Sequence, residues 1–243
     1  MQQGIRSLFQ RMADSRREAV CERCGRRTEL FFGKGVCDDC MDHMWAEREE
    51  ARRRSLLVDY QAHLIRSGLL SPDTPAITFA AARPASRENA EAVARLRTWS
   101  MAQNLFLYGP SGVGKSFYAR CLLNGAMRAG KSVAEMPVRS LLTAALRYDR
   151  GRGTFAACCR ADVLLVDDID KGAYNEDRLG AIWELLDARC QGGRRTIVTS
   201  NLDPVELAKD WVRRVPQNTS YGVAALDRLK PVSVCALSGV SLR

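Results

Sequence analysis

A glycine-rich loop near the middle of the chain carries the residues with the clearest chemistry. In residues 104–116, NLFLYGPSGVGKS, an apolar run leads into a loop that ends in Lys115 and Ser116. The glycines allow a tight turn that aims several backbone N–H groups into one concavity, and the following helix adds its positive N-terminal end. This spacing predicts a cradle for the phosphates of ATP, with Lys115 at the β- and γ-phosphates and the Ser116 hydroxyl on the bridging Mg²⁺. The residues expected to form this cradle are Gly109, Pro110, Ser111, Gly112, Val113, Gly114, Lys115, Ser116 and Phe117.

A second segment supplies the acids that such a loop needs. Residues 162–170, DVLLVDDID, combine an apolar run with four aspartates. The run at 163–166 is typical of a strand buried on both faces of a parallel sheet, which brings the next residue to the carboxyl end, where ligands bind. We expect Asp167 to hold the Mg²⁺ and Asp168 to polarise the attacking water as a general base.

A third apolar segment, at 196–200 in RRTIVTSNL, ends at Asn201. Its side-chain amide could hold the lytic water or the γ-phosphate from a neighbouring strand. Asn is also a common N-cap, and a helix that starts near Pro204 would offer it that position. The sequence leaves both interpretations open.

Four cysteines near the N-terminus have metal-ligand spacing. Two C-x2-C pairs, Cys21 with Cys24 and Cys37 with Cys40, are separated by twelve residues. This pattern predicts a closed, four-thiolate Zn²⁺ site with a structural role, since no coordination position is left open for catalysis. A region of about forty residues buries too little apolar surface to fold alone, so the metal would contribute the missing folding energy. Two disulfides are the alternative, which the absence of an apolar signal segment at the N-terminus disfavours.

The length of the chain, 243 residues, suits two unequal domains. We expect a zinc-binding domain at 1–43, a linker helix at 44–71 and a larger domain at 72–243. The linker pattern consists of the i,i+4 pairs Glu49–Arg53 and Glu50–Arg54 and an apolar stripe at Leu56, Tyr60 and Leu64. SPDTP at 71–75 would end the helix, and we expect the stripe to dock on the larger domain rather than on a partner.

Together the motifs closely resemble those of one family. GPSGVGKS, VLLVDDID, IVTSNL and ALDRL at 225–229 occur in the order and spacing of the AAA+ ATPases of the DnaC, DnaI and IstB group, relatives of DnaA. The resemblance covers roughly 72–243 and implies an α/β fold, a P-loop parallel sheet with helices on both faces. It also implies that Arg228 contacts ATP on an adjacent subunit as an arginine finger, so that the protein self-associates through its ATP interfaces. Arg243 matches the family's second sensor only loosely.

The net charge of +9 is concentrated in the middle of the chain. Residues 61–160 hold 14 Lys or Arg against five Asp or Glu, whereas the flanking parts are nearly balanced. By resemblance to DnaA and DnaC, the segment 138–155 would face single-stranded DNA, with arginines on phosphates and Tyr148 or Phe155 stacked on a base. The alternative is a solvated basic face with core aromatics.

Three functions compete for these features. The resemblance to DnaI-type loaders, which also carry a zinc module before the ATPase, favours an ATP-dependent loader that places the replicative DNA helicase on single-stranded DNA. An IstB-like ATPase regulator of DNA transposition is the main alternative. The third, a zinc adaptor that no longer hydrolyses ATP, is disfavoured by the intact Lys115, Ser116, Asp167, Asp168 and Asn201. With no apolar run long enough to cross a membrane, we expect a cytoplasmic ATPase without membrane contact.

Overall fold

The computed structural model describes residues 16–31, 35–84, 86–146 and 153–239. The chain divides into two compact units, Met1–Asp59 and Tyr60–Arg243. In the first unit, β1 (Arg16–Val20) and β2 (Arg27–Phe31) form an antiparallel hairpin, and most of the long helix α2 (Asp38–Arg66) follows. The sequence prediction placed this helix at 44–71, so the observed helix begins six residues earlier and includes Cys40.

The second unit is built on a five-stranded sheet in the order β4-β5-β6-β3-β7, with every neighbouring pair parallel. Its strands are β3 (Asn104–Tyr108), β4 (Val133–Pro137), β5 (Val163–Asp167), β6 (Arg195–Ser200) and β7 (Val232–Ala236). The expected α/β parallel sheet is therefore confirmed. Because β6 lies between β5 and β3, the ends of the acidic strand and of the phosphate-loop strand flank the end of β6.

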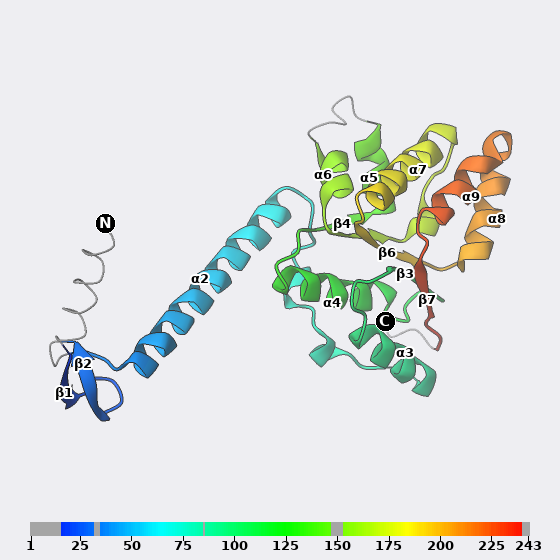
Figure 1. Ribbon diagram of the computed structural model, residues 1–243. Helices are drawn as coiled ribbons and strands as arrows, with labels where there is room; N and C mark the ends of the chain where they lie inside the picture. Colours follow the sequence, from blue (N-terminus) through cyan, green and yellow to red (C-terminus); the bar gives the residue numbers. More distant parts are fainter. Residues whose placement is uncertain (1–15, 32–34, 85, 147–152, 240–243) are drawn as a thin grey trace. The chain divides into compact units, whose positions relative to one another are not determined.

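Helices cover both faces of the sheet. Figure 1 shows α3 and α4 on one side and α5, α6 and α7 on the other, while α8 and α9 pack on one another and, through α9, on α7. The bounds are α3 (Arg87–Arg97), α4 (Lys115–Arg128), α5 (Val138–Ala145), α6 (Thr154–Arg160), α7 (Glu176–Gln191), α8 (Pro204–Arg214) and α9 (Thr219–Asp227). Short 3₁₀ turns lie at η1 (Thr74–Ala76), η2 (Phe79–Ala81), η3 (Ile169–Lys171) and η4 (Pro216–Asn218).

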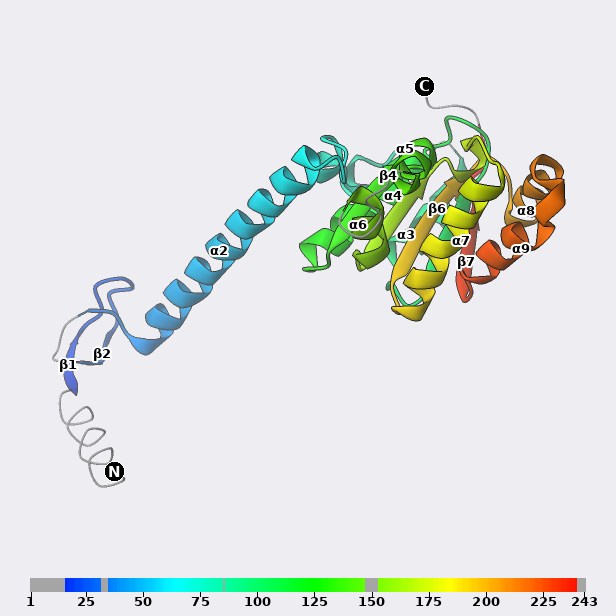
Figure 2. The ribbon, with the colours of Figure 1, turned by 90° about the horizontal axis from the view of Figure 1, so that it is seen from above.

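The core lies between these helix layers and the sheet, whose strands are also visible from above in Figure 2. Residues 163–166 of β5 are at most 1 % exposed, as expected for a strand covered on both faces. Leu105, Phe106 and Leu107 of β3 are at most 2 % exposed. This rigid centre fixes where the strands end, and the polar residues of the candidate site follow directly after those ends.

The end of α2 that belongs to the second unit packs on that unit. Leu64 is 4 % exposed, and the Tyr60 hydroxyl accepts a hydrogen bond from the backbone N–H of Val133 at 2.9 Å. The expectation that the apolar stripe docks within the chain is confirmed for these two residues. Both predicted Glu–Arg pairs, Glu49–Arg53 and Glu50–Arg54, are present as ion pairs. Among the described residues, no helix has the length and apolar character needed to span a membrane.

Candidate nucleotide-binding site and metal centre

The glycine-rich loop lies between the carboxyl end of β3 and the start of α4. Gly109 has a φ of 144°, and a Cβ at this position would lie 1.9 Å from the backbone oxygen of Leu237. Gly114, the residue before α4, has a left-handed φ of 93°. A side chain would clash at Gly109 and would be strained at Gly114, so both positions require glycine. The turn that they form leaves backbone N–H groups accessible at the N-terminus of α4.

Lys115 reaches across the loop instead of pointing away from it. Its Nζ lies 2.8 Å from the carbonyl oxygens of both Gly109 and Pro110 and 2.9 Å from Asn201 Oδ1. The residue is 6 % exposed, and this burial lowers the pKa of the ammonium, while the negative charge of Asp168 opposes the shift. The ammonium is therefore held at the mouth of the phosphate cradle, where it can exchange carbonyl oxygens for phosphate oxygens.

Ser116 and Asp167 lie side by side, as their proposed shared role requires. Ser116 Oγ donates to Asp167 Oδ1 at 2.7 Å, and Thr199 Oγ1 of the neighbouring strand donates to the same oxygen at 2.6 Å. A hydroxyl and a carboxylate are hard oxygen donors of the type that Mg²⁺ takes alongside phosphate and water. The donor set therefore fits Mg²⁺. Thr199 is a site residue that the sequence analysis missed.

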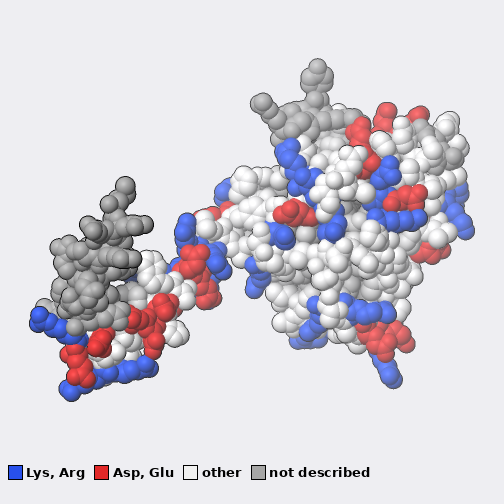
Figure 3. All heavy atoms as spheres, viewed as in Figure 1, with Lys and Arg blue, Asp and Glu red and all other residues white. Residues whose placement is uncertain are grey.

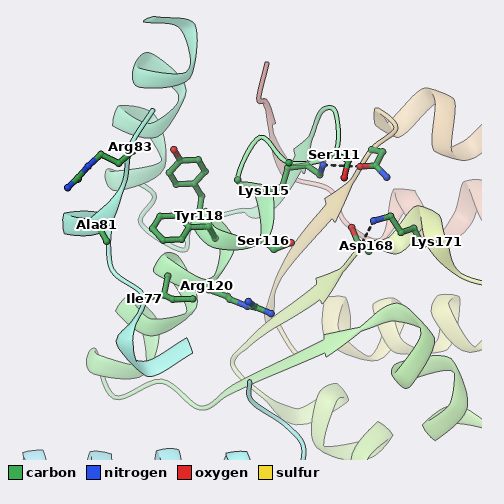
Figure 4. A pocket seen from close by; sticks show the side chains of 14 residues that line it. Ile77, Ala81, Arg83, Ser111, Lys115, Ser116, Tyr118, Arg120, Asp168 and Lys171 are labelled. Atoms are coloured by element: carbon green, nitrogen blue, oxygen red, sulfur yellow. Dashed lines mark hydrogen bonds and ion pairs between the residues drawn. The ribbon is translucent and has the colours of Figure 1, made fainter. Parts of the chain in front are cut away.

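Asp168 lies at the edge of the cavity in a left-handed conformation, with a φ of 56°. Its backbone N–H donates to Thr199 Oγ1 at 2.8 Å, which stabilises this unusual backbone. Its Oδ2 forms an ion pair with Lys171 Nζ at 2.8 Å, and Figure 4 shows the two side chains directed toward one another. The carboxylate proposed as general base is thus engaged by a lysine three residues away.

Asn201 lies between Lys115 and Asp170. Its backbone N–H and its Nδ2 donate to the two carboxylate oxygens of Asp170 at 3.0 and 2.9 Å. The N-cap of α8 is Asp203, which forms a capping box with Glu206. The interpretation of Asn201 as a helix cap is therefore wrong. Asp170 was missed as a functional residue, although it ends the acidic motif.

A cavity of about 370 Å³ opens beside these residues. One side is polar and contains Lys115, Ser116 and Asp168, whereas the other is formed by the segment before α3, which includes the 3₁₀ turn η2, and by the first turn of α4. The lining of this second side includes Ile77, Ala81, Arg83, Phe117 and Tyr118. Apart from Arg83, these residues form an apolar wall that faces the phosphate cradle, which suits a nucleoside base. The volume of the cavity lies within the usual range for ligand pockets.

The wall of the cavity is held in place by α4. Asn124 Nδ2 donates to the carbonyl oxygens of Pro75 and Ile77 at 3.1 and 2.9 Å, and the ring of Phe79 stacks on Tyr118 with centroids 6.4 Å apart. These contacts join residues far apart in sequence, so sequence patterns did not reveal the wall.

The family assignment follows from the comparison with known proteins. The profile of the family described as IstB-like ATP binding protein matches residues 37–243. The chain belongs to this family. The expected resemblance to the DnaC, DnaI and IstB group is thereby confirmed, and nucleotide binding is the property that the family description carries.

Two curated relatives of this IstB-like chain are insertion sequence ATP-binding proteins. That of Sinorhizobium fredii, y4pL, is 39 % identical over 145 residues, which cover 58 % of this chain and 56 % of the relative. That of IS1162 from Pseudomonas fluorescens is 38 % identical over 103 residues, or 41 % of this chain and 44 % of the relative. The match thus spans about half the length of these relatives.

Solved structures show the same fold. DnaI superposes with a TM-score of 0.58 and 17 % identity, covering 70 % of the IstB-like chain and 95 % of DnaI. The DnaC helicase loader superposes with a TM-score of 0.57 and 15 % identity, covering 69 % of this chain and the whole of the solved DnaC chain. At this identity the likeness shows the AAA+ fold and no more.

Arg228 of the IstB-like chain follows α9 directly and is not among the residues that line the nucleotide cavity. Its Nε pairs with Asp187 Oδ1 of α7 at 2.5 Å, and its side chain is 41 % exposed. The proposed role on an adjacent subunit stays a prediction. Arg243 lies outside the described residues.

The four cysteines of the first unit converge. Their sulfurs lie within 4.8 Å of one another, with Cys24 Sγ and Cys37 Sγ 3.8 Å apart. A tetrahedral Zn²⁺ with bonds of about 2.3 Å would separate sulfurs by about 3.8 Å, so the donor set and spacing fit this metal. Backbone N–H groups of Cys24 and Cys37 lower the pKa of Cys21 to about 6, whereas burial raises the pKa of Cys40 to about 12. All four are free cysteines, in contrast to the disulfide alternative.

The predicted DNA-facing segment at 138–155 is only partly described. Residues 147–152, including Tyr148, lie outside the described residues. Phe155 is 6 % exposed and belongs to the core, so its proposed stacking on a base is wrong. Burial of this large apolar ring stabilises the packing of α6 and removes the ring from solvent. Arg139 of α5 is exposed, as a role in contact with phosphate requires.

Proposed function

We propose that this IstB-like chain hydrolyses ATP and, as an ATP-bound oligomer, acts on DNA as the regulatory ATPase of a transposition system. The observation that carries the proposal is that Lys115, Ser116 and Asn201 line one cavity and that Asp167, at the end of a third strand, accepts a hydrogen bond from Ser116. The insertion sequence relatives support the transposition role over helicase loading, which the sequence motifs alone had favoured.

The residues divide the work of hydrolysis among themselves. Lys115 neutralises charge on the β- and γ-phosphates. Ser116 and Asp167 would hold Mg²⁺, which would supply further neutralisation of the phosphate oxygens. Asp168 accepts the proton of the attacking water, and Asn201, oriented by Asp170, positions that water or the γ-phosphate. The site is completed by Arg228 of an adjacent subunit, whose planar guanidinium suits charge that develops on the transferred phosphoryl group.

Loading of the replicative helicase onto single-stranded DNA is the second candidate. The observation that favours it is the four-cysteine cluster in front of the ATPase unit, which resembles the zinc module of DnaI-type loaders. In this alternative the zinc module docks on the helicase while the ATPase oligomer holds the DNA strand.

The two candidates differ in what the protein binds in the presence of ATP. We suggest measuring ATP turnover and the ATP-dependent assembly of the full chain on duplex DNA, together with a pull-down against the host's replicative helicase. Assembly on duplex DNA without helicase binding would support the transposition role. Helicase binding that is lost in a Cys24→Ser, Cys37→Ser variant would support the loader. A chain that neither binds nor hydrolyses ATP would exclude both.

A further inference from the structure

A second cavity, of about 470 Å³, lies next to the nucleotide cavity and is unusually rich in cations. Its lining consists of Arg139, Leu142, Thr143, Lys171, Gly172, Ala173, Arg178 and Arg214, and we call it the basic cavity. None of these lining residues, all in the described part of the chain, is an Asp or Glu. On the face of the second unit that Figure 3 shows, positive and negative side chains are interspersed. The basic cavity therefore differs from an ordinary solvated surface.

The arginines of this cavity are positioned by one short loop. Arg139 Nε of α5 donates to the carbonyl oxygen of Lys171 at 3.2 Å, and Arg214 Nη1 of α8 donates to that of Gly172 at 3.0 Å. Arg178 Nη1 of α7 donates to the next carbonyl, that of Ala173, at 2.7 Å. Three helices thus bring three guanidinium groups onto three successive peptide units.

These hydrogen bonds leave most of the guanidinium donors available. Each arginine has five N–H groups and uses only some of them on the loop. Arg178 Nε is buried and has no hydrogen-bond partner in the described structure. Arg214 also pairs with Asp210 at 2.7 Å, so part of its charge is already neutralised. An anion in the cavity would pair with the unused donors and relieve the repulsion among like charges.

Lys171 connects the basic cavity to the nucleotide site, because it lines both cavities. Its ammonium pairs with Asp168, the proposed general base, at 2.8 Å. Both side chains are partly exposed, at 40 % and 36 %, so the pair is screened by solvent and can be separated at modest cost. An anion bound in the basic cavity would compete with Asp168 for this lysine.

We propose that the basic cavity binds a phosphodiester group of DNA and that this binding draws Lys171 away from Asp168, which frees the carboxylate for hydrolysis. The planar guanidinium groups of the three arginines can each donate two parallel hydrogen bonds to phosphate oxygens. A net charge of +9 also favours a polyanionic partner. The second half of the inference rests on the proposed ATPase function, and it makes ATP hydrolysis dependent on DNA.

The binding half is tested with labelled duplex DNA and the full chain at several salt concentrations. Arg139→Ala and Arg178→Ala are expected to weaken binding about tenfold, and each lost phosphate contact should reduce the slope of log K against log salt by about 0.9. Arg139→Lys changes the same position but keeps the positive charge, so it tests whether weaker binding by Arg139→Ala comes from misfolding. The matched control is Arg87→Ala, an exposed arginine of α3 outside the cavity, which should change neither quantity. Unchanged affinity and slope in both cavity variants would overturn the proposal.

Free phosphate is the other source of the same oxyanion. Stimulation of ATP turnover by inorganic phosphate to the level reached with DNA would overturn the assignment to DNA, whereas stimulation by DNA alone supports it.

The coupling half is tested with Lys171→Met. Without its ammonium, Asp168 is unpaired from the start, so turnover in the absence of DNA should rise severalfold and the stimulation by DNA should shrink. Turnover at or below that of the wild type would overturn the release step. A wild-type protein without any ATPase activity would instead overturn the proposed function, and DNA stimulation that survives the cavity substitutions would overturn this inference alone.

Discussion

Asp170 accepts two hydrogen bonds from Asn201, one from the backbone N–H and one from Nδ2, at 3.0 and 2.9 Å. Asp170 is 9 % exposed, so the two bonds are protected from water and orient the amide firmly. The amide oxygen is thereby turned toward Lys115, at 2.9 Å. Asp170, which does not line the cavity, thus orients the side chain of Asn201, which does.

Replacement of Asp170 by Asn should slow hydrolysis more than it weakens ATP binding. The substitution replaces one acceptor with a donor that faces Asn201 Nδ2, so the amide loses its fixed direction. We expect the turnover number to fall about 10-fold to 100-fold, by analogy with other losses of an orienting partner, with little change in ATP affinity. Asp177→Asn, an exposed position in the first turn of α7, is the matched control. Equal turnover in the two variants would contradict the orienting role.

Lys115→Ala should abolish ATP binding. Its ammonium is the buried cation that the phosphate loop directs toward the cradle, and we expect the dissociation constant for a fluorescent ATP analogue to rise at least about 100-fold. Lys131→Ala, at an exposed position beyond α4, controls for the loss of one positive charge. If Lys115→Ala retains wild-type affinity while it stays folded, the nucleotide site has been assigned wrongly.

Arg228→Ala should bind ATP normally but lose most of its turnover, since arginine fingers contribute about 10³-fold or more. The test of its action between subunits is a mixture of this variant with Lys115→Ala. In one of its two orientations, a mixed interface combines the intact phosphate loop of the Arg228→Ala subunit with the intact Arg228 of the Lys115→Ala subunit, so the mixture should regain activity that neither variant has alone. A mixture that stays as inactive as its components would argue against the role in trans.

The ion pair between Arg228 and Asp187 within one subunit is tested separately. Asp187→Asn leaves Arg228 in place and removes only its partner in the same chain. If Arg228 acts on a neighbouring subunit, this variant should keep its activity, whereas a purely structural role for the pair predicts the same loss in both variants.

Zinc removal should unfold the cysteine-containing unit selectively. The purified chain is expected to contain about one Zn²⁺, and chelation should make residues 16–43 sensitive to protease, because the metal supplies folding energy that the small core lacks. The ATPase unit should keep its thermal unfolding transition and its ATP affinity. Cys24→Ser should reproduce the effect of the chelator, and Cys121→Ser, a buried cysteine of α4, is the control. A metal-free protein with two disulfides would contradict the zinc assignment.

The parts of the site that are continuous in sequence could be predicted. The phosphate loop, the buried strand before Asp167 and the two cysteine pairs depend on neighbours only a few residues away, and the structure has them where the patterns indicated. Phe155 was misjudged because a pattern of charges does not reveal which face of a short helix is buried.

The sequence by itself determined the fold class and the set of chemical groups, because loop spacing, strand hydropathy and cysteine spacing act over short stretches of chain. Only the tertiary structure decided how those groups are paired. Asp170 meets Asn201, and Arg228 meets Asp187, across separations of 31 and 41 residues. The first pairing exists because β6 pairs directly with β5, and the second because α9 packs on α7. These contacts follow from how the whole sheet and its helix layers pack, and no local pattern encodes that packing.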